Sequence, residues 1–271
     1  LGQEPPLKFR RIMFCAATAL AADSPLQPPP RCGSVLLSVR GGEILVSYGG
    51  QTARGELLSD VTLFSVRLNS WVKAAVQCEE SPAGHSAADD FPDRRVWHAG
   101  ASLEPVRPSK ALVFGGFDGM DYSDSLLLFT TDASDMRKPS ITWVDPRAEG
   151  KPPCPRFGHS ANMYTPATAA AATAAGGGGT GGSSKFVVFG GRGGEVAGVQ
   201  THLSDVAVLE VSAGRMQWRP VRVHGKLPAG RFKHSAAVVQ NQLVVFGGYG
   251  AAKAAVGRLR GGATGRSAVC L

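Results

Sequence analysis

The sequence predicts an all-β protein built as a stack of similar β-units, and two observations support this fold class. First, a short apolar segment runs into a Gly-Gly pair four times, ending at Gly50, Gly116, Gly191 and Gly248. Successive pairs are 66, 75 and 57 residues apart, which indicates a repeated structural unit. Second, the 35 glycines and 18 prolines of this 271-residue chain fall between apolar segments, which indicates many turns.

Each unit is expected to contain four short strands, because the same signals recur in the same order. An Arg followed three residues later by a His precedes the first strand in three units, and the first unit keeps Arg31 but has Ser34 in place of the His. The Gly-Gly pair ends the second strand, a Ser-Asp pair begins the third, and a Trp marks the fourth. The arginines of the other units are Arg95, Arg156 and Arg231, the Ser-Asp pairs are 59–60, 123–124 and 204–205, and the tryptophans are Trp71, Trp143 and Trp218.

This order of motifs resembles the Kelch repeat over residues 31 to 250. The resemblance implies a Kelch-type β-propeller, in which each unit is a four-stranded blade around a central axis. We expect a partial propeller with three complete blades, at about 31–94, 95–155 and 156–230, and part of a fourth at 231–248. The fourth unit lacks the Ser-Asp and Trp strands, so we expect a piece of a longer protein or a chain with non-native ends.

Four segments fall outside the repeat pattern. Residues 1–30 are interpreted as a short helix, a remnant of an upstream blade or a disordered lead, and their basic-then-apolar layout leaves a signal peptide as an alternative. An insertion at about 85–94 lengthens one link between units. Residues 166–184 are of low Ala/Gly/Thr complexity and are expected to form a flexible loop. The basic, Gly/Ala/Arg-rich tail at 249–271 has no strand periodicity, so we expect it to be disordered or non-native.

Composition narrows the possible partners. The net charge is +8, but much of the excess lies in the two ends of the chain, which argues against a nucleic-acid partner without excluding one. The five cysteines are scattered and form no C-x-x-C pair, so we expect reduced thiols and a cytoplasmic protein, with the nucleus as an alternative and secretion disfavoured. No run of 18 apolar residues exists, so no membrane span is predicted.

One face of the predicted propeller is the better candidate for binding. In an antiparallel blade, the loops after the Gly-Gly pairs and the links between units lie at the same end of the strands. Aromatic and Arg side chains on such loops commonly anchor partners, although polar loops can equally be just solvated. The candidate binding residues are Arg54, Phe117, Asp118, Asp121, Tyr122, Arg192, Glu195 and Tyr249, next to an acidic insertion with Asp89, Asp90 and Asp93.

The repeated Arg and His side chains are interpreted as framework. They could form a ring of general bases or metal ligands, but catalytic residues are rarely repeated in every unit. The sequence also lacks the E-x-x-x-D-x-x-x-H iron motif, a phosphate-binding Walker loop, the G-x-S-x-G elbow and the H-E-x-x-H zinc motif. We therefore expect no catalytic residue, no metal and no cofactor.

The resemblance implies a non-catalytic protein–protein interaction module, used as a scaffold or substrate adaptor. One alternative is an accessory propeller of an RNA-modifying enzyme, such as a methyltransferase of tRNA wybutosine synthesis, for which a basic chain would be suitable. Metal-dependent catalysis in the propeller channel is a third interpretation, disfavoured by the missing ligand motifs.

Overall fold

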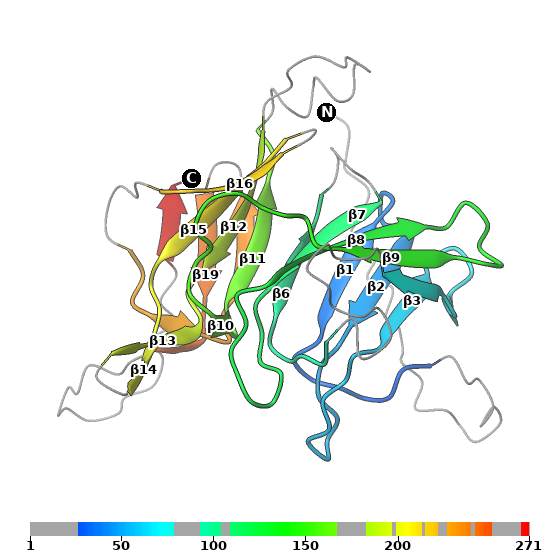
Figure 1. The fold of residues 1–271 in the computed structure, drawn as a ribbon, viewed down its shortest axis with the longest axis horizontal. Helices are drawn as coiled ribbons and strands as arrows, with labels where there is room; N and C mark the ends of the chain where they lie inside the picture. The colour runs from blue at the N-terminus through cyan, green and yellow to red at the C-terminus, as the bar shows by residue number, and fades with distance from the viewer. Residues whose placement is uncertain are drawn as a thin grey trace, which may run out of the picture.

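The computed structural model describes residues 27–78, 93–103, 109–166, 183–196, 199–212, 215–221, 227–239, 242–250 and 267–270. In this part of the chain every regular element is a strand, and several small sheets follow one another along the sequence. The arrangement is consistent with a β-propeller-like fold (Figure 1). We call the four successive main sheets blades 1 to 4. Most of the lead, the long-link insertion and the low-complexity loop lie outside the described residues.

Blades 1 to 3 each contain the four antiparallel strands that the motifs predict, in consecutive order. Blade 1 consists of β1 (Val35–Val39), β2 (Ile44–Tyr48), β3 (Val61–Ser65) and β4 (Ser70–Val72). Blade 2 contains β6 (Ala99–Ser102), β7 (Lys110–Phe114), β8 (Leu126–Asp132) and β9 (Ser140–Val144). Blade 3 consists of β11 (Ser160–Tyr164), β12 (Ser184–Phe189), β15 (Val206–Val211) and β16 (Met216–Arg219).

Blade 2 gains a fifth strand that the sequence pattern did not predict. The link after blade 1 forms β5 (Ala75–Cys78), which pairs in parallel with the outer strand β9. A shorter version recurs at the next blade, where Glu149 bridges in parallel to Gln217 of β16. An outer strand has an edge of unpaired backbone groups, and the passing link satisfies part of that edge.

Blade 4 also differs from expectation, because the tail contributes a strand to it. The blade contains β18 (Ser235–Val239) and β19 (Gln242–Phe246), and β21 (Ser267–Cys270) pairs with β19 in the place of a third strand. The tail was expected to contain no strand. Its pairing depends on backbone hydrogen bonds to the open edge of β19, a signal that side-chain periodicity does not report.

The segment before each first strand pairs with the loop after the Gly-Gly pair. In blade 3, β10 (Arg156–Phe157) pairs with β13 (Arg192–Val196), which continues into β14 (Val199–His202). In blade 4, β17 (Arg231–Phe232) pairs with β20 (Tyr249–Gly250). Blades 1 and 2 have single bridges at the same places, Cys32 to Gln51 and Val96 to Phe117. The loops and links therefore meet at one end of the strands, as strand parity predicts, and we call this surface the loop face.

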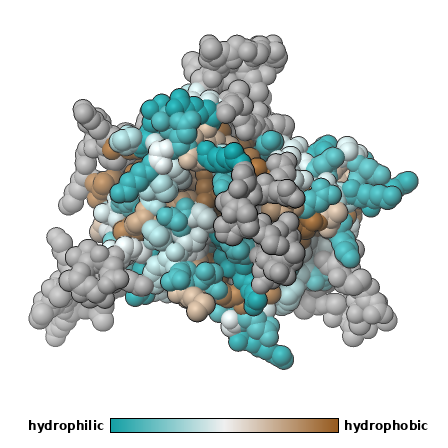
Figure 2. Space-filling model, viewed as in Figure 1, coloured by the Kyte–Doolittle hydropathy of each residue, from teal (hydrophilic) through white to brown (hydrophobic). Residues whose placement is uncertain are grey.

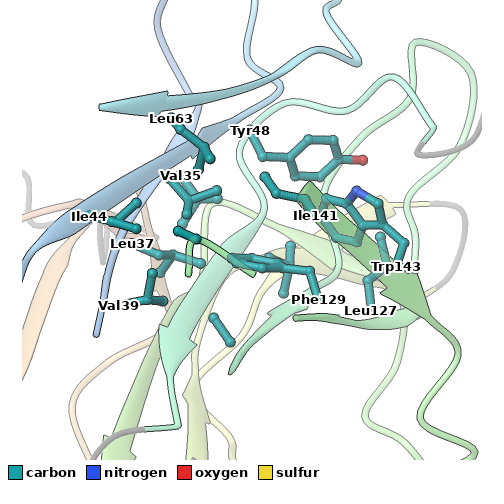
Figure 3. Close-up of a cluster of buried hydrophobic side chains, with 14 residues drawn as sticks. Val35, Leu37, Val39, Ile44, Tyr48, Leu63, Leu127, Phe129, Ile141 and Trp143 are labelled. Carbon is teal, nitrogen blue, oxygen red and sulfur yellow. The ribbon is translucent and has the colours of Figure 1, made fainter. Parts of the chain in front are cut away.

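The hydrophobic core lies between blades rather than within one sheet. Alternate residues of β1 and β2 pack against β7, β8 and β9 of blade 2, and Figure 3 shows the Tyr48 ring beside Trp143, with centroids 5.0 Å apart. Two similar clusters join blades 2 and 3 and blades 3 and 4. Trp143 and Trp218 are buried at these contacts, as expected for outer-strand packing residues. The first strands β1, β6, β11 and β18 contact one another in that order.

Candidate binding face

The repeated Arg makes hydrogen bonds within its own blade, which indicates a structural role. Its guanidinium donates to the carbonyl oxygen of the first glycine in the Gly-Gly pair of its own blade. In blades 1 and 3 it also makes a two-pronged ion pair with the Asp that precedes the third strand, at 2.6 and 2.7 Å to Asp60 and 2.8 Å twice to Asp205. The four Arg–carbonyl pairs are Arg31–Gly49 at 3.0 Å, Arg95–Gly115 at 3.1 Å, Arg156–Gly190 at 3.0 Å and Arg231–Gly247 at 2.9 Å.

In blade 2 the leading Arg pairs with a different carboxylate, that of Asp93. The residue directly before β8 is Ser125, not Asp124, and its hydroxyl accepts from Arg95 at 2.9 Å. The second guanidinium nitrogen of Arg95 donates to Asp93 at 3.2 Å. Asp93 was grouped with an acidic insertion for binding, but its carboxylate lies against the framework. Asp89 and Asp90 lie outside the described residues.

The repeated His residues join neighbouring blades. Each packs with its ring beside the aromatic residue that precedes the Gly-Gly pair of the blade before, with centroids 4.9 to 5.5 Å apart. Burial, with a smaller effect of the adjacent Arg charge, lowers the pKa of His98 and of His159 to about 3. The same two causes lower the pKa of His234 to about 4. These imidazoles therefore stay neutral at physiological pH, and the geometry supports a framework role for them.

One position of the Arg-x-x-His motif, directly before the His, lies where the segments that lead into successive blades meet. It is occupied by Gly33, Trp97, Gly158 and Lys233 in blades 1 to 4, and all four backbones are left-handed, with φ between 54° and 67°. In blades 2 to 4 the amide of this residue donates to the carbonyl of the equivalent residue in the preceding blade, at 2.7, 2.7 and 2.6 Å. We call this chain of residues the axial row. Only glycine adopts such a backbone without strain, so Trp97 and Lys233 are exceptions.

The two non-glycine side chains of the axial row meet. The ammonium of Lys233 lies 3.8 Å from the centroid of the Trp97 ring, within the range of a cation–π contact. They border a cavity of about 230 Å³ at the axis, large enough for several water molecules or a small side chain. The cavity is lined by the axial row together with Ser34, His98, His159 and His234.

A continuous row of aromatic rings crosses the loop face from blade 2 to blade 4. The Tyr122 ring lies 5.6 Å from Phe117 and 4.9 Å from Phe157. Phe157 lies 5.8 Å from Phe232, which in turn is 5.6 Å from Tyr249. The first four rings are half-buried, whereas Tyr249 is 69% exposed. We call these five residues the aromatic row.

The structure brings together only some of the predicted binding residues. Phe117, Tyr122 and Tyr249 belong to the aromatic row. Asp118 and Asp121 are exposed on the loop beside Phe117, where the Asp118 carboxylate accepts from the amides of Met120 and Asp121 at 2.8 and 2.7 Å. Burial pushes the pKa of Asp118 upward, but these hydrogen bonds outweigh it and hold the pKa below its ordinary value.

The other three predicted residues lie apart from these ring contacts. Arg54 is exposed on the loop of blade 1. Arg192 has a half-buried side chain and pairs through its backbone with Phe157 and His202. Glu195 pairs through its backbone with Gln200, after a bulge.

Four residues of this face were missed from the sequence. Phe157, Phe232, Trp97 and Lys233 all lie inside the Arg-x-x-His motif, at its two middle positions. The available signal was variation within a repeated motif. The flanking Arg and His recur, whereas the third position alternates between glycine and the bulky residues Trp97 and Lys233.

The described residues also bear on metal binding and on membrane insertion. In that part of the chain no group of three or more His, Cys, Asp or Glu side chains is arranged to hold a metal ion. Among the same residues, no helix has the length and apolar character needed to cross a membrane.

Comparison with known proteins gives distant relatives. No protein-family model matches the chain. A probable serine/threonine-protein kinase of Dictyostelium discoideum is 27% identical over 86% of this chain and 14% of its own length. The leucine-zipper-like transcriptional regulator 1 homolog of Drosophila melanogaster is 25% identical over 74% of this chain and 16% of its own. Human host cell factor 2 is 25% identical over 82% of this chain and 25% of its own, and human host cell factor 1 matches over 10% of its length.

These similarities support the Kelch resemblance at low identity. The chain spans between about a tenth and a quarter of the length of these relatives. Each match therefore covers one part of a larger protein.

Proposed function

We propose that the chain is a non-catalytic protein-interaction module whose loop face binds the partner, with the axial row and the aromatic row as its contact surface. The observation that carries the proposal is the presence of Trp97 and Lys233 at left-handed backbone positions. A left-handed backbone costs a non-glycine residue about 1–2 kcal/mol. Blades 1 and 3 have glycine at the same place, so the framework does not require these two side chains.

The composition of the surface supports recognition of a protein. Trp, Tyr and Arg are the side chains that most often anchor protein partners, and this surface contains Trp97, Tyr122 and Tyr249. On this face, the exposed Tyr249 ring and the exposed Lys233 ammonium both lie near Phe232, at 5.6 Å and 5.9 Å from the centroid of its ring. Strain retained at a surface of this composition is typical of functional sites.

The chemistry of the axis suits binding better than acid–base catalysis. The three His rings beside the cavity have pKa values of about 3 to 4 and contact the framework of the neighbouring blade. A general base needs a pKa near the working pH. One relative is named as a transcriptional regulator and two are named as host cell factors, and these names agree with scaffold or adaptor duty in the cytoplasm or nucleus. One relative is named as a probable kinase, and the chain matches 14% of it.

The test removes the two side chains without disturbing their backbones. Trp97→Gly with Lys233→Gly gives all four blades a glycine in the axial row, so the free energy of unfolding should change little. The variant and the native chain are used as affinity baits, and recovered proteins are quantified by mass spectrometry. We expect specific partners of the native chain to be depleted at least tenfold by the variant.

The matched control is Arg40→Gly, which also replaces a cationic residue at positive φ, 56°, with glycine. Arg40 lies in the turn between β1 and β2, at the opposite end of the strands from the loop face. Depletion by Arg40→Gly and not by the axial variant would assign binding to the other face and contradict the proposal. A native chain that recovers no protein but binds tRNA, with affinity falling steeply as salt rises, would favour the RNA-modification alternative.

A further inference from the structure

The three junctions between blades share one set of contacts. The second glycine of each Gly-Gly pair donates its amide to the carbonyl of the Arg that leads the next blade, at 2.9, 2.8 and 2.8 Å. The aromatic residue before the pair, which is Tyr48, Phe114 or Phe189, is fully buried against the next His. A junction therefore has two halves. We call the aromatic residue and the two glycines the acceptor half, and the lead and first strand of the next blade the donor half. These terms refer to the blade that is received and not to the direction of the hydrogen bond.

Blade 4 presents a fourth acceptor half that no described residue fills. Phe246 occupies the place of the three buried aromatics but is 49% exposed. Gly247 and Gly248 already have the positive φ of the other pairs, 71° and 83°. A Cβ placed on Gly247 would meet no atom within 4 Å, whereas the equivalent glycines of blades 1 to 3 are crowded by the next blade. Val239, on the same face of the sheet, is 54% exposed.

Blade 1 presents a donor half with altered side chains. Its lead keeps Arg31, but Ser34 stands where the other leads have His. Two residues on, Leu36 is 58% exposed and stands where the other first strands have Gly100, Ala161 and Ala236. Residues 34 and 36 lie on the same face of the strand. The larger Leu36 side chain therefore replaces the side-chain volume that is lost where Ser34 stands in place of His.

We propose that the acceptor half of blade 4 binds the donor half of blade 1 in a second copy of this chain, so that two copies close head to tail. In this contact the exposed Phe246 packs on Leu36 of the other copy, with Ser34 leaving the room that a His would fill. Continuity with the three internal junctions carries the inference, because both halves already have the required backbone. The four blades of the described residues, taken from each of two copies, give eight, which is within the four to eight of β-propellers. A head-to-tail contact is heterologous, and such contacts form a closed ring when the rotation from one copy to the next returns to the first copy.

The experiment measures the mass of the whole chain in solution by light scattering or sedimentation between about 1 and 100 μM. We expect a concentration-dependent shift from one chain to two. Phe246→Asp and Leu36→Asp should each leave the chain monomeric over this range, because burying an unpaired carboxylate disfavours the contact. Both positions are about half exposed in the single chain, so circular dichroism should show unchanged folding. Met120→Asp, at an 89% exposed position outside both halves, is the control and should dimerise like the native chain.

Mixing the two monomeric variants tests the head-to-tail geometry. The Phe246→Asp chain keeps an intact donor half and the Leu36→Asp chain keeps an intact acceptor half, so an equimolar mixture should recover a two-chain species that neither variant forms alone. A monomeric native chain at 100 μM would overturn the proposal. So would a dimer that persists in both variants, a mixture that stays monomeric, or a species that keeps growing beyond two chains. The outcome is independent of partner binding at the loop face.

Discussion

At the scale of single residues, the first glycine of each Gly-Gly pair has two separate reasons to be glycine. Its backbone is left-handed, with φ between 64° and 71° in the four blades. In blades 1 to 3 a Cβ would also lie within 2.6 to 2.8 Å of the carbonyl oxygen of the Arg that leads the next blade. Gly247 has the first constraint without the second, which allows the two to be separated by substitution.

We expect Gly190→Ala to lower the free energy of unfolding by about 3–4 kcal/mol, from backbone strain and the clash with the Arg231 carbonyl. Gly247→Ala should cost only about 1 kcal/mol, because the strain is the same and the space is open. Urea unfolding of dilute protein measures both. Equal costs for the two substitutions would show that the close approach between blades 3 and 4 contributes nothing.

The leading arginines allow a similar comparison between equivalent positions. Arg156 is fully buried and donates to Asp205, to Gly190 and to the carbonyl of Cys154. Arg231 is half-buried and donates to two carbonyl oxygens, those of Ala229 and Gly247, with no carboxylate partner among the described residues.

Arg156→Ala is therefore expected to cost about 2–3 kcal/mol in the free energy of unfolding, since it leaves the buried Gly190 carbonyl without its donor and removes the ion pair to the half-exposed Asp205. Arg231→Ala should cost about 1 kcal/mol. Chemical denaturation of the two variants against the native chain gives both values. A cost for Arg231→Ala that matches or exceeds that of Arg156→Ala would contradict the framework role inferred from the ion pair.

At the scale of elements, the strands that side-chain patterns could predict are those with a buried face. The second strands β2, β7 and β12 are strongly apolar and end at Gly-Gly, so their existence and ends followed from sequence. β5 and β21 did not, because each joins a sheet through backbone pairing at an open edge. The same limit applied to the binding face. Loops could be assigned to it from strand parity, but the ring contacts of Phe157 and Phe232 depend on how adjacent blades approach.

Because β5 is held by pairing at one edge, it should open far more readily than the strands it joins. Three of its four residues are exposed, whereas the first four residues of β8 are buried. In hydrogen–deuterium exchange, the amides of β5 should exchange at least a hundredfold faster than those of β8. Comparable protection of the two strands would mean that the link is an integral strand of blade 2 and that its opening unfolds the whole sheet.

At the scale of the whole molecule, the buried histidines couple blade association to pH. His98 and His159 are nearly fully buried at the first and second junctions, and burial lowers the pKa of each from about 6.5 to about 3. The unfolded chain therefore binds more protons than the folded chain between these two values. Stability rises with pH wherever the unfolded state binds more protons, so the folded blades should lose stability as pH falls below about 6.5.

Moving from pH 7.5 to pH 5.5 should lower the free energy of unfolding by about 1.3 kcal/mol for each of these two histidines. The exact folded-state pKa has little effect on this stability difference between pH 7.5 and pH 5.5, because both rings are neutral in the folded protein at both pH values. His159→Gln lowers stability at both pH values but should reduce the difference between them by about 1.3 kcal/mol. Urea titrations at the two pH values measure the difference. If the native chain is equally or more stable at pH 5.5, the histidines are not held neutral between the blades.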